Sequence, residues 1–242
     1  MRFISSSKMA LFLATVGLSS FVACGEAGGP VSPPPPGTGP DVTLEPAKDN
    51  TLFEEGPLSN GAGQFLFAGM TVDTVSRRAL VQFDVAGSAV PSGATIDSVQ
   101  FVLRMDRTIV DGISVAIHRV TADWGEADSD AEFAEGKGIA AEPGDATWLQ
   151  RFFDTTPWTT PGGDFVAAPS ATQTVGNDVQ PYTWGSTAQM VQDVQGWLDD
   201  PANNFGWIVI ADESTHTTAK RFGSREEASA NRPKLLIYFT AP

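Results

Sequence analysis

The sequence predicts an all-β domain, an antiparallel β-sandwich with one short helix packed on it. Three observations predict this class: apolar and polar residues alternate along several segments, Gly, Pro, Asn and Asp punctuate the intervals, and helical spacing is confined to one segment. The intervals mostly lack helical patterns, which argues against a parallel α/β sheet. Residues 41–242 number about 200, enough for one large sandwich that buries its core without disulfides.

Five segments carry the strand signal. Residues 77–85, 95–105 and 113–117 alternate, so one set of side chains in each should face the core. Residues 207–211 and 235–239 are near-continuous apolar runs, as expected of buried strands. Their β-branched and aromatic composition fits a pleated, packed surface.

Residues 186–198 break this period of two. The apolar residues at helical spacing are Met190, Val191, Val194, Trp197 and Leu198. We expect Ser186 and Gln189 to form a capping box and Pro201 to stop the helix. The apolar stripe should lie against the sandwich.

The N-terminus has the layout of a secretory signal. Residues 1–23 run from basic residues through an apolar stretch to small residues before Cys24, and the apolar stretch is too short to span a membrane. Cys24 is the only cysteine and ends a Phe-Val-Ala-Cys sequence that resembles a lipobox, so we expect cleavage before Cys24 and lipidation of its sulfur. Ordinary cleavage nearby, leaving a free thiol, is the alternative. Gly25 stands where an aspartate would indicate inner-membrane retention, which favours the outer membrane or the cell exterior.

Residues 25–40 are rich in Pro and Gly and cannot bury a core. Their proline run favours extended polyproline geometry, so we expect a semi-rigid spacer. The chain therefore divides into a signal peptide (1–23), a lipidated cysteine with its linker (24–40) and a sandwich domain (41–242).

The chain is strongly acidic. Its formal charge of −14 becomes −16 once Arg2 and Lys8 leave with the signal peptide. Such a surface repels nucleic acid, so we expect no nucleic-acid partner, and we expect membrane contact only through the lipid anchor. It attracts cations, and calcium prefers carboxylate and carbonyl oxygens, so bound calcium is a hypothesis although no compact D-x-D-x-D run is present.

Sequence motifs for catalysis are absent, and we expect a protein that is not an enzyme. The chain contains no H-E-x-x-H, no G-x-S-x-G and no Gly-rich phosphate loop. His118 and His216 are far apart and match no metal-ligand spacing, and we expect His118 to be a half-exposed strand residue. A glycosidase-like carboxylate pair is the strongest enzymatic alternative. Residues 123–130 place four acidic side chains around Trp124, which favours a solvated loop with a buried tryptophan over a sugar or calcium site.

Two tryptophans are candidate ligand-binding residues. Trp158 and Trp184 lie in stretches rich in Pro, Gly and Thr. Tryptophans in loops can offer flat faces to sugar rings, with nearby polar groups fixing the orientation. Packing over an end of the sandwich is the alternative, because large aromatic side chains bury well.

A basic segment is the second candidate. Lys220, Arg221 and Arg225 lie close together between two buried strands of an acidic chain. They could bind the carboxylates of an acidic polysaccharide through charge-assisted hydrogen bonds. The alternative is internal ion pairing with neighbouring acidic residues, namely Glu226, Glu227 or Asp212.

Short motifs that match one known family occur in order along nearly all of residues 42–240. They are 49–52 (Asp-Asn-Thr-Leu), 60–61 (Asn-Gly), 78–84 (Arg-Ala-Leu-Val-Gln-Phe-Asp), 91–96 (Pro-Ser-Gly-Ala-Thr-Ile), 120–124 (Val-Thr-Ala-Asp-Trp), 144–148 (Gly-Asp-Ala-Thr-Trp), Trp158, 162–165 (Gly-Gly-Asp-Phe), Trp197, 204–207 (Asn-Phe-Gly-Trp), 222–226 (Phe-Gly-Ser-Arg-Glu) and 232–235 (Arg-Pro-Lys-Leu). Together they resemble the DNRLRE domains. The resemblance implies a jelly-roll-like sandwich related to carbohydrate-binding modules of family 96, found in secreted and surface proteins. It implies no catalytic site and supplies no ligand residues.

Three functions follow, in order of preference. The first is a surface-anchored or secreted module that binds polysaccharide without catalysis. The second is a structural or adhesive extracellular protein without a small ligand. The third is a polysaccharide hydrolase or lyase, which needs two carboxylates or a Tyr/His/Arg set in a cleft.

Overall fold

A computed structural model describes residues 39–133 and 135–242 of the chain. The predicted signal peptide, the predicted lipidation at Cys24 and nearly all of the linker lie outside these residues. The strands are β1 (Val42–Leu44), β2 (Lys48–Phe53), β3 (Leu58–Ser59), β4 (Phe65–Met70), β5 (Ser76–Gln82), β6 (Thr95–Arg107), β7 (Ile113–Arg119), β8 (Ile139–Ala140), β9 (Gln150–Phe152), β10 (Thr156–Pro157), β11 (Ala171–Val175), β12 (Gln180–Trp184), β13 (Trp207–Ala211), β14 (Lys220–Gly223) and β15 (Lys234–Thr240). The helices are α1 (Ala188–Asp199) and a short 3-10 turn, Pro201–Asn203.

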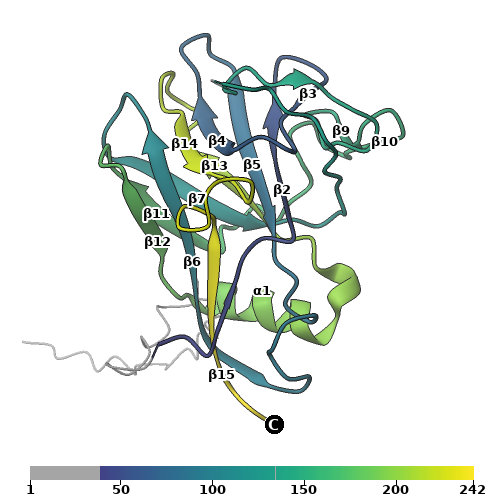
Figure 1. The fold of residues 1–242 in the computed structure, drawn as a ribbon, viewed down its shortest axis with the longest axis vertical. Helices are drawn as coiled ribbons and strands as arrows, with labels where there is room; N and C mark the ends of the chain where they lie inside the picture. Colours follow the sequence, from purple (N-terminus) through teal and green to yellow (C-terminus); the bar gives the residue numbers. More distant parts are fainter. Residues whose placement is uncertain (1–38, 134) are drawn as a thin grey trace, which may run out of the picture.

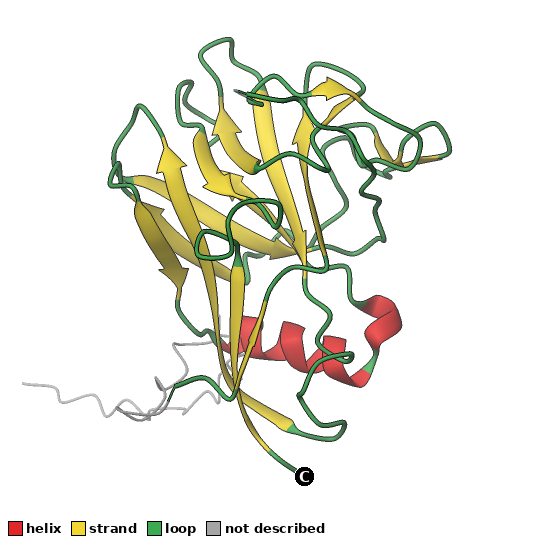
Figure 2. Ribbon diagram, in the orientation of Figure 1, coloured by secondary structure: helices red, strands yellow, loops and turns green. Residues whose placement is uncertain are grey.

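Eleven of the described strands form one antiparallel sheet that curls over on itself, and β3–β8 and β9–β10 form two separate two-stranded sheets (Figures 1 and 2). The first half-sheet contains β1, β15, β6, β14 and β4 in that order. Strands β15 and β14 pair with successive parts of one edge of β6, and β12 pairs with its opposite edge. The second half-sheet contains β5, β13, β7 and β11, with β2 beside β5. Strand β4 belongs to both, because its first four residues pair with β14 and its last two, Gly69 and Met70, pair with β5. The predicted jelly-roll-like antiparallel sandwich with one short helix is confirmed.

The main core lies between the half-sheets and follows the predicted alternation. Inward-facing side chains of β5 and the residues after it, of β6 and of β7 all enter it, among them Ala79, Val81, Phe83, Val99, Phe101, Leu103, Met105, Val115 and Ile117. Trp207 of β13 packs against Phe101 of β6, with ring centroids 5.7 Å apart. Strand β5 ends at Gln82, earlier than predicted, because Asp84 accepts a hydrogen bond from the Gly87 amide and forms a turn.

A second, smaller core lies on the outer face of the second half-sheet. Leu52, Leu80 and Ile208 point away from the main core and are covered by residues 120–166, which contribute Val120, Trp124, Ala146 and Trp158. The segment 120–166 is called the cover below. Trp124 is fully buried and its indole N–H donates to the Phe205 carbonyl at 2.8 Å. Strands β2, β5 and β13 of the second half-sheet are therefore buried on both faces, whereas the outward side chains of β11 are largely exposed.

Helix α1 closes one end of the sandwich, as its apolar stripe predicted. Met190, Val194, Trp197 and Leu198 are buried in the main core. The predicted capping box is wrong by one residue: Thr187 is the N-cap, and its hydroxyl accepts from the Met190 amide at 3.0 Å. The Ser186 hydroxyl instead accepts from the Val99 amide of β6, and Gln189 donates to Asp193. None of the helices in the described ranges has the length and apolar character needed to cross a membrane.

The two ends of the described chain lie together at the end of the sandwich that α1 closes (Figure 1). Strand β1 pairs with β15, and the Asp41 backbone amide donates to the Ile237 carbonyl at 3.0 Å. Strand β6 starts at this end, where the Ile96 amide donates to Gln195 of α1. Its 13 residues span about 40 Å at the usual rise of a strand, so Arg107 lies at the opposite end of the molecule.

Candidate functional site

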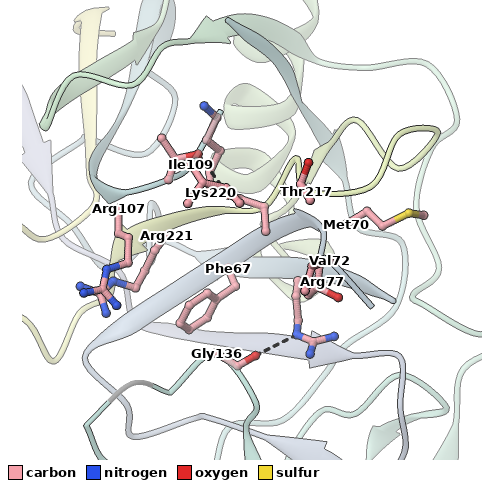
Figure 3. Close-up of a pocket in the computed structure, with 13 residues that line it drawn as sticks. Phe67, Met70, Val72, Arg77, Arg107, Ile109, Gly136, Thr217, Lys220 and Arg221 are labelled. Atoms are coloured by element: carbon pink, nitrogen blue, oxygen red, sulfur yellow. Dashed lines mark hydrogen bonds between the residues drawn. The ribbon is translucent and has the colours of Figure 1, made fainter. Parts of the chain in front are cut away.

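A pocket of about 250 Å³ lies at the end of the sandwich remote from α1 (Figure 3). It forms where β4 passes from one half-sheet to the other. Its walls come from the ends of β4, β6 and β14, from the β4–β5 turn and from Gly136 of the cover. The lining side chains include Phe67, Met70, Val72, Arg77, Arg107, Ile109, Thr217, Lys220 and Arg221.

Strand alternation places the floor of this pocket. On β4 and β14, Leu66 and Phe222 are paired and face the main core. The adjacent pair, Phe67 and Arg221, therefore faces the other way. Phe67 packs against Phe53 of β2, with ring centroids 6.5 Å apart, so one face of the pocket is aromatic and fixed by packing.

The rim carries apolar side chains that are open to solvent. Val72 is 69% exposed and Ile109 is 81% exposed, and both line the pocket beside Phe67 and Met70. Single exposed apolar residues are ordinary, whereas several gathered around a hollow are typical of an interaction site.

The arginines around the pocket differ in how firmly they are held. The Arg221 guanidinium donates to both carboxylate oxygens of Asp106 at 2.6 Å and lies 3.7 Å from the centroid of the Phe65 ring. Arg77 pairs with Glu55 and is almost fully buried. Arg107 is exposed and forms no ion pair with any residue in the described ranges. It is therefore the cation at the pocket that is available to a ligand.

Lys220 lines the pocket with its alkyl chain only, which corrects the prediction that its ammonium binds a ligand. The side chain faces inward on β14 and is fully buried. Its ammonium donates to the Val110 carbonyl at 2.6 Å and the Gly176 carbonyl at 2.9 Å. Burial lowers the pKa of Lys220, and the nearby Asp111 carboxylate opposes that shift. The ammonium thus ties two loops together inside the fold.

Arg225 lies away from the pocket, so the predicted basic segment is not one surface. Its Nε is 3.0 Å from Glu226, a partner named in the alternative of internal pairing, and 2.9 Å from Glu126, which that alternative did not include. Of the three predicted cations, Arg221 is the one whose guanidinium borders the pocket.

The two predicted tryptophans are packing residues and offer no free ring face. Trp158 is 5% exposed in the second core, and its indole N–H donates to the Thr147 carbonyl. Trp184 is fully buried in the main core, and its N–H donates to the Val115 carbonyl. Loop composition suggested exposure, but Trp184 ends a strand that pairs with β6 and Trp158 is held under the cover.

The histidines and the acidic run take the places expected of them. His118 lies half-buried on β7, its Nδ1–H donates to the Val166 carbonyl at 3.0 Å, and its pKa is lowered mainly by burial. His216 is exposed in the loop before β14. Within 123–130, Trp124 is buried and Asp128 faces solvent, whereas Glu126 turns inward.

Glu126 joins Asp49 and Glu226 in a carboxylate cluster that sequence reasoning missed. One oxygen from each lies within 4.8 Å of the others. Burial raises the pKa of all three carboxyls, and the pKa of Asp49 lies well above its usual range because Glu226 and Glu126 add to the effect of burial. These are the described residues most suited to holding a cation.

Phe67, Arg107 and Ile109 were also missed as site residues. Alternation in 95–105 predicted the strand but not where it ends, and no local signal showed that its far end meets the β4–β5 turn. Comparison of the sequence with protein-family models and with curated proteins finds no match in either set. The resemblance to DNRLRE domains therefore stays a prediction from the motifs.

Proposed function

We propose that this chain is a non-catalytic module that binds a carboxylate-bearing polysaccharide in the pocket between Phe67, Ile109 and Arg107. The observation that carries the proposal is a free guanidinium beside an aromatic floor on an otherwise acidic protein. Sugar rings present C–H faces that pack on aromatic and apolar side chains, and guanidinium groups bind carboxylates in a bidentate manner. The motif resemblance and the predicted export signal support the same function at the cell surface.

The preformed geometry of the site also supports binding. Arg221 is fixed by Asp106 and Phe65, so its position needs no ordering when a ligand arrives. Arg107 supplies the unpaired charge, and the exposed Val72 and Ile109 gain by losing contact with water. A pocket of about 250 Å³ suits one or two sugar residues of a chain that continues over the surface.

The test is binding of the purified full chain to polygalacturonate, alginate and neutral β-glucans by calorimetry at low and moderate salt. We expect saturable binding to the acidic polymers that weakens as salt rises, since exposed charge pairs are screened. Arg107→Ala should weaken binding by about 10- to 100-fold, the value of a charged hydrogen bond. Arg151→Ala is the matched control, because it removes the same charge from the cover.

Equal affinities for the Arg107→Ala variant and the wild type would place the site elsewhere. No binding to any polymer by a folded chain would support a structural or adhesive protein instead. Incubation with the bound polymer should release no reducing ends and no unsaturated products. Release of either would replace this proposal with a hydrolase or lyase.

A further inference from the structure

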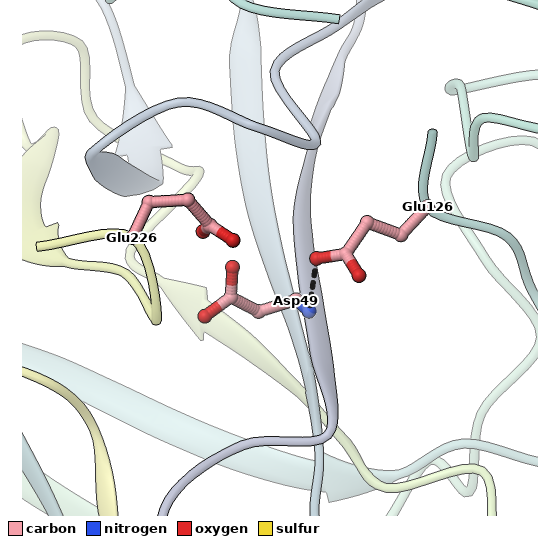
Figure 4. A group of neighbouring side chains, drawn as sticks. All are labelled: Asp49, Glu126 and Glu226. Carbon is pink, nitrogen blue, oxygen red and sulfur yellow. Dashed lines mark hydrogen bonds between the residues drawn. The ribbon is translucent and has the colours of Figure 1, made fainter. Parts of the chain in front are cut away.

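The carboxylate cluster joins three segments that are distant in the sequence (Figure 4). Asp49 lies in β2, Glu126 in the cover and Glu226 in the loop between β14 and β15. In Figure 4 the Asp49 carboxylate faces that of Glu226, and Glu126 approaches from the other side, where it accepts from the Asp49 amide. The cluster is separate from the polysaccharide pocket, and none of its three residues lines that pocket.

One oxygen of this cluster is buried without a hydrogen-bond partner. Asp49 is 1% exposed, and its Oδ1 has no donor near it. Its Oδ2 accepts from the Arg225 amide at 2.8 Å, so Oδ1 is the oxygen of this side chain that is left without a donor. A buried carboxylate oxygen without a partner costs free energy, and such a group in a native protein calls for an explanation, such as an ordered water, a bound ion or a functional role.

The other two carboxylates also keep coordinating capacity. The Glu126 Oε1 atom accepts from the Asp49 amide and from Arg225, both at 2.9 Å. The Glu226 Oε1 atom lies 3.0 Å from Arg225 Nε, and its Oε2 accepts from the Ser224 hydroxyl at 3.2 Å. Glu126 Oε2 and Asp49 Oδ1 remain as the principal free oxygens, with Glu226 Oε2 partly used.

The charges around the cluster do not balance. Lys48 pairs with Asp123 at 2.9 Å and donates to the Trp124 carbonyl, so it is largely committed outside the cluster. The Arg225 guanidinium pairs with Glu126 and Glu226, whereas Asp49 accepts a hydrogen bond only from the Arg225 backbone amide. When all groups are ionised, the carboxylates of Asp49, Glu126, Glu226 and Asp123 exceed the cations Lys48 and Arg225 by two negative charges, which one divalent ion neutralises.

We propose that Asp49, Glu126 and Glu226 bind one calcium ion, with Asp49 Oδ1 as a direct ligand and water completing the shell. Calcium takes oxygen ligands at 2.3–2.6 Å in flexible geometry, which suits three carboxylates carried by separate segments. Magnesium demands a smaller, near-octahedral shell and keeps most of its water. The ion would join β2, the cover and the β14–β15 loop, and so couple the two half-sheets to the segment that covers one of them. A proton on Asp49 is the competing account, and the experiment separates the two.

The full chain is treated with chelator, exchanged into buffer at pH 7.5 and titrated with CaCl₂ and with MgCl₂ by calorimetry. We expect one calcium site with a Kd of about 10⁻⁴ to 10⁻³ M and magnesium binding at least about tenfold weaker. In about 10 mM CaCl₂ the melting temperature should rise by about 3 to 6 °C over the chelated protein. If neither saturable heat nor a thermal shift is seen up to about 10 mM CaCl₂, the proposal is overturned, and a proton on Asp49 is the remaining explanation of the cluster. Magnesium bound as tightly as calcium would overturn the assignment to calcium.

Asp49→Asn and Glu226→Gln keep the shape of the side chains and remove one charge each. Each should weaken calcium binding by more than about tenfold and abolish most of the thermal shift. Asp128→Asn is the matched control, because Asp128 is exposed in the same acidic run, and it should bind calcium as the wild type does. Wild-type affinity in both cluster variants would place the ion elsewhere. Glu226 is only half-buried, so its variant carries the test should Asp49→Asn fail to fold.

Discussion

The two outer faces of this sandwich differ in whether other parts of the chain cover them. The outer face formed by β2, β5 and β13 is apolar, with Leu52, Leu80 and Ile208, and is closed by the cover. The outer face of β4 and β14 carries Phe65, Phe67 and Arg221 and stays partly open around the pocket. Both faces hold large aromatic and apolar side chains, yet only one leaves them within reach of a ligand.

This difference separates aromatic residues that stabilise from those that can bind. Trp124 and Trp158 fill the second core, and their indole N–H groups donate to backbone carbonyls. Phe67 has no polar atom to satisfy, and although it is only 8% exposed, it lines an open pocket together with Arg107. The side chains best suited to ligand binding are therefore found on the uncovered face, where the sequence offers phenylalanine and arginine rather than tryptophan.

Trp124→Ala is the strongest test of the covered face. It removes one of the two tryptophans of the second core together with its hydrogen bond to Phe205. We expect a loss of about 3 to 5 kcal/mol in the free energy of unfolding, measured by urea denaturation. A loss below about 1 kcal/mol would mean that the cover contributes little to the fold and that the two faces are alike.

Phe67→Ala tests the open face. Truncation should lower the free energy of unfolding by about 1.5 to 3 kcal/mol, and it should weaken polysaccharide binding by more than about tenfold because the floor of the pocket is lost. Leu66→Ala is the matched control: its side chain faces the main core one residue earlier on β4, so it should cost about 2 to 5 kcal/mol of stability and leave affinity unchanged. Equal affinity losses in the two variants would attribute both to misfolding.

The smallest expected effect is the change in stability of the Asp49→Asn variant with pH. It tests the carboxylate cluster, which joins β2 to the cover and to the β14–β15 loop. Burial and the neighbouring Glu226 and Glu126 carboxylates raise the pKa of Asp49, so the folded state binds its proton more tightly than the unfolded state does. The stability from this group is present below the ordinary pKa of 3.8 and is lost as pH rises through the raised pKa. In chelator, Asp49→Asn should therefore be more stable than the wild type at pH 7.5, by an amount on the order of 1 kcal/mol, and the advantage should shrink toward acidic pH.

Thermal unfolding of both proteins across pH 4 to 8 measures this difference. Calcium should reverse its sign at pH 7.5, since the variant loses the ion. Asp128→Asn should match the wild type at every pH. A variant that is less stable than the wild type in chelator at pH 7.5 would show that the Asp49 charge is already compensated.

Periodicity predicted the fold well because it depends on which side of a strand each residue faces. The sets Val99, Phe101, Leu103 and Met105 and the helical stripe around Trp197 all entered the main core. Periodicity says nothing of what lies against the opposite side. The cover over Leu80 and Ile208 could not be foreseen, so Trp158 stayed a candidate for ligand binding beside the alternative of packing.

The candidate sites depend on contacts between distant residues. Arg221 meets Asp106 across 115 positions, and the Arg225 amide meets Asp49 across 176. The basic segment was a useful signal, but its three cations do not form one surface. Lys220 and Arg221 are successive residues of β14 and point to opposite sides of the strand, and Arg225 lies in the loop that follows. Lys220 therefore points inward, whereas Arg221 borders the pocket and Arg225 reaches the carboxylate cluster.

Because the two ends of the described chain are paired at one end of the sandwich, the anchor side and the pocket lie at opposite ends of the molecule. Strand β1 pairs with β15, β15 pairs with β6, and β6 carries Arg107 at its far end. An anchor attached ahead of residue 39 would hold the protein at one end, while a polysaccharide in the pocket would pull on the other. That load would run along β1, β15 and β6 and shear their hydrogen bonds together instead of unzipping them one by one, so the same pairing that brings the termini together would resist detachment under flow.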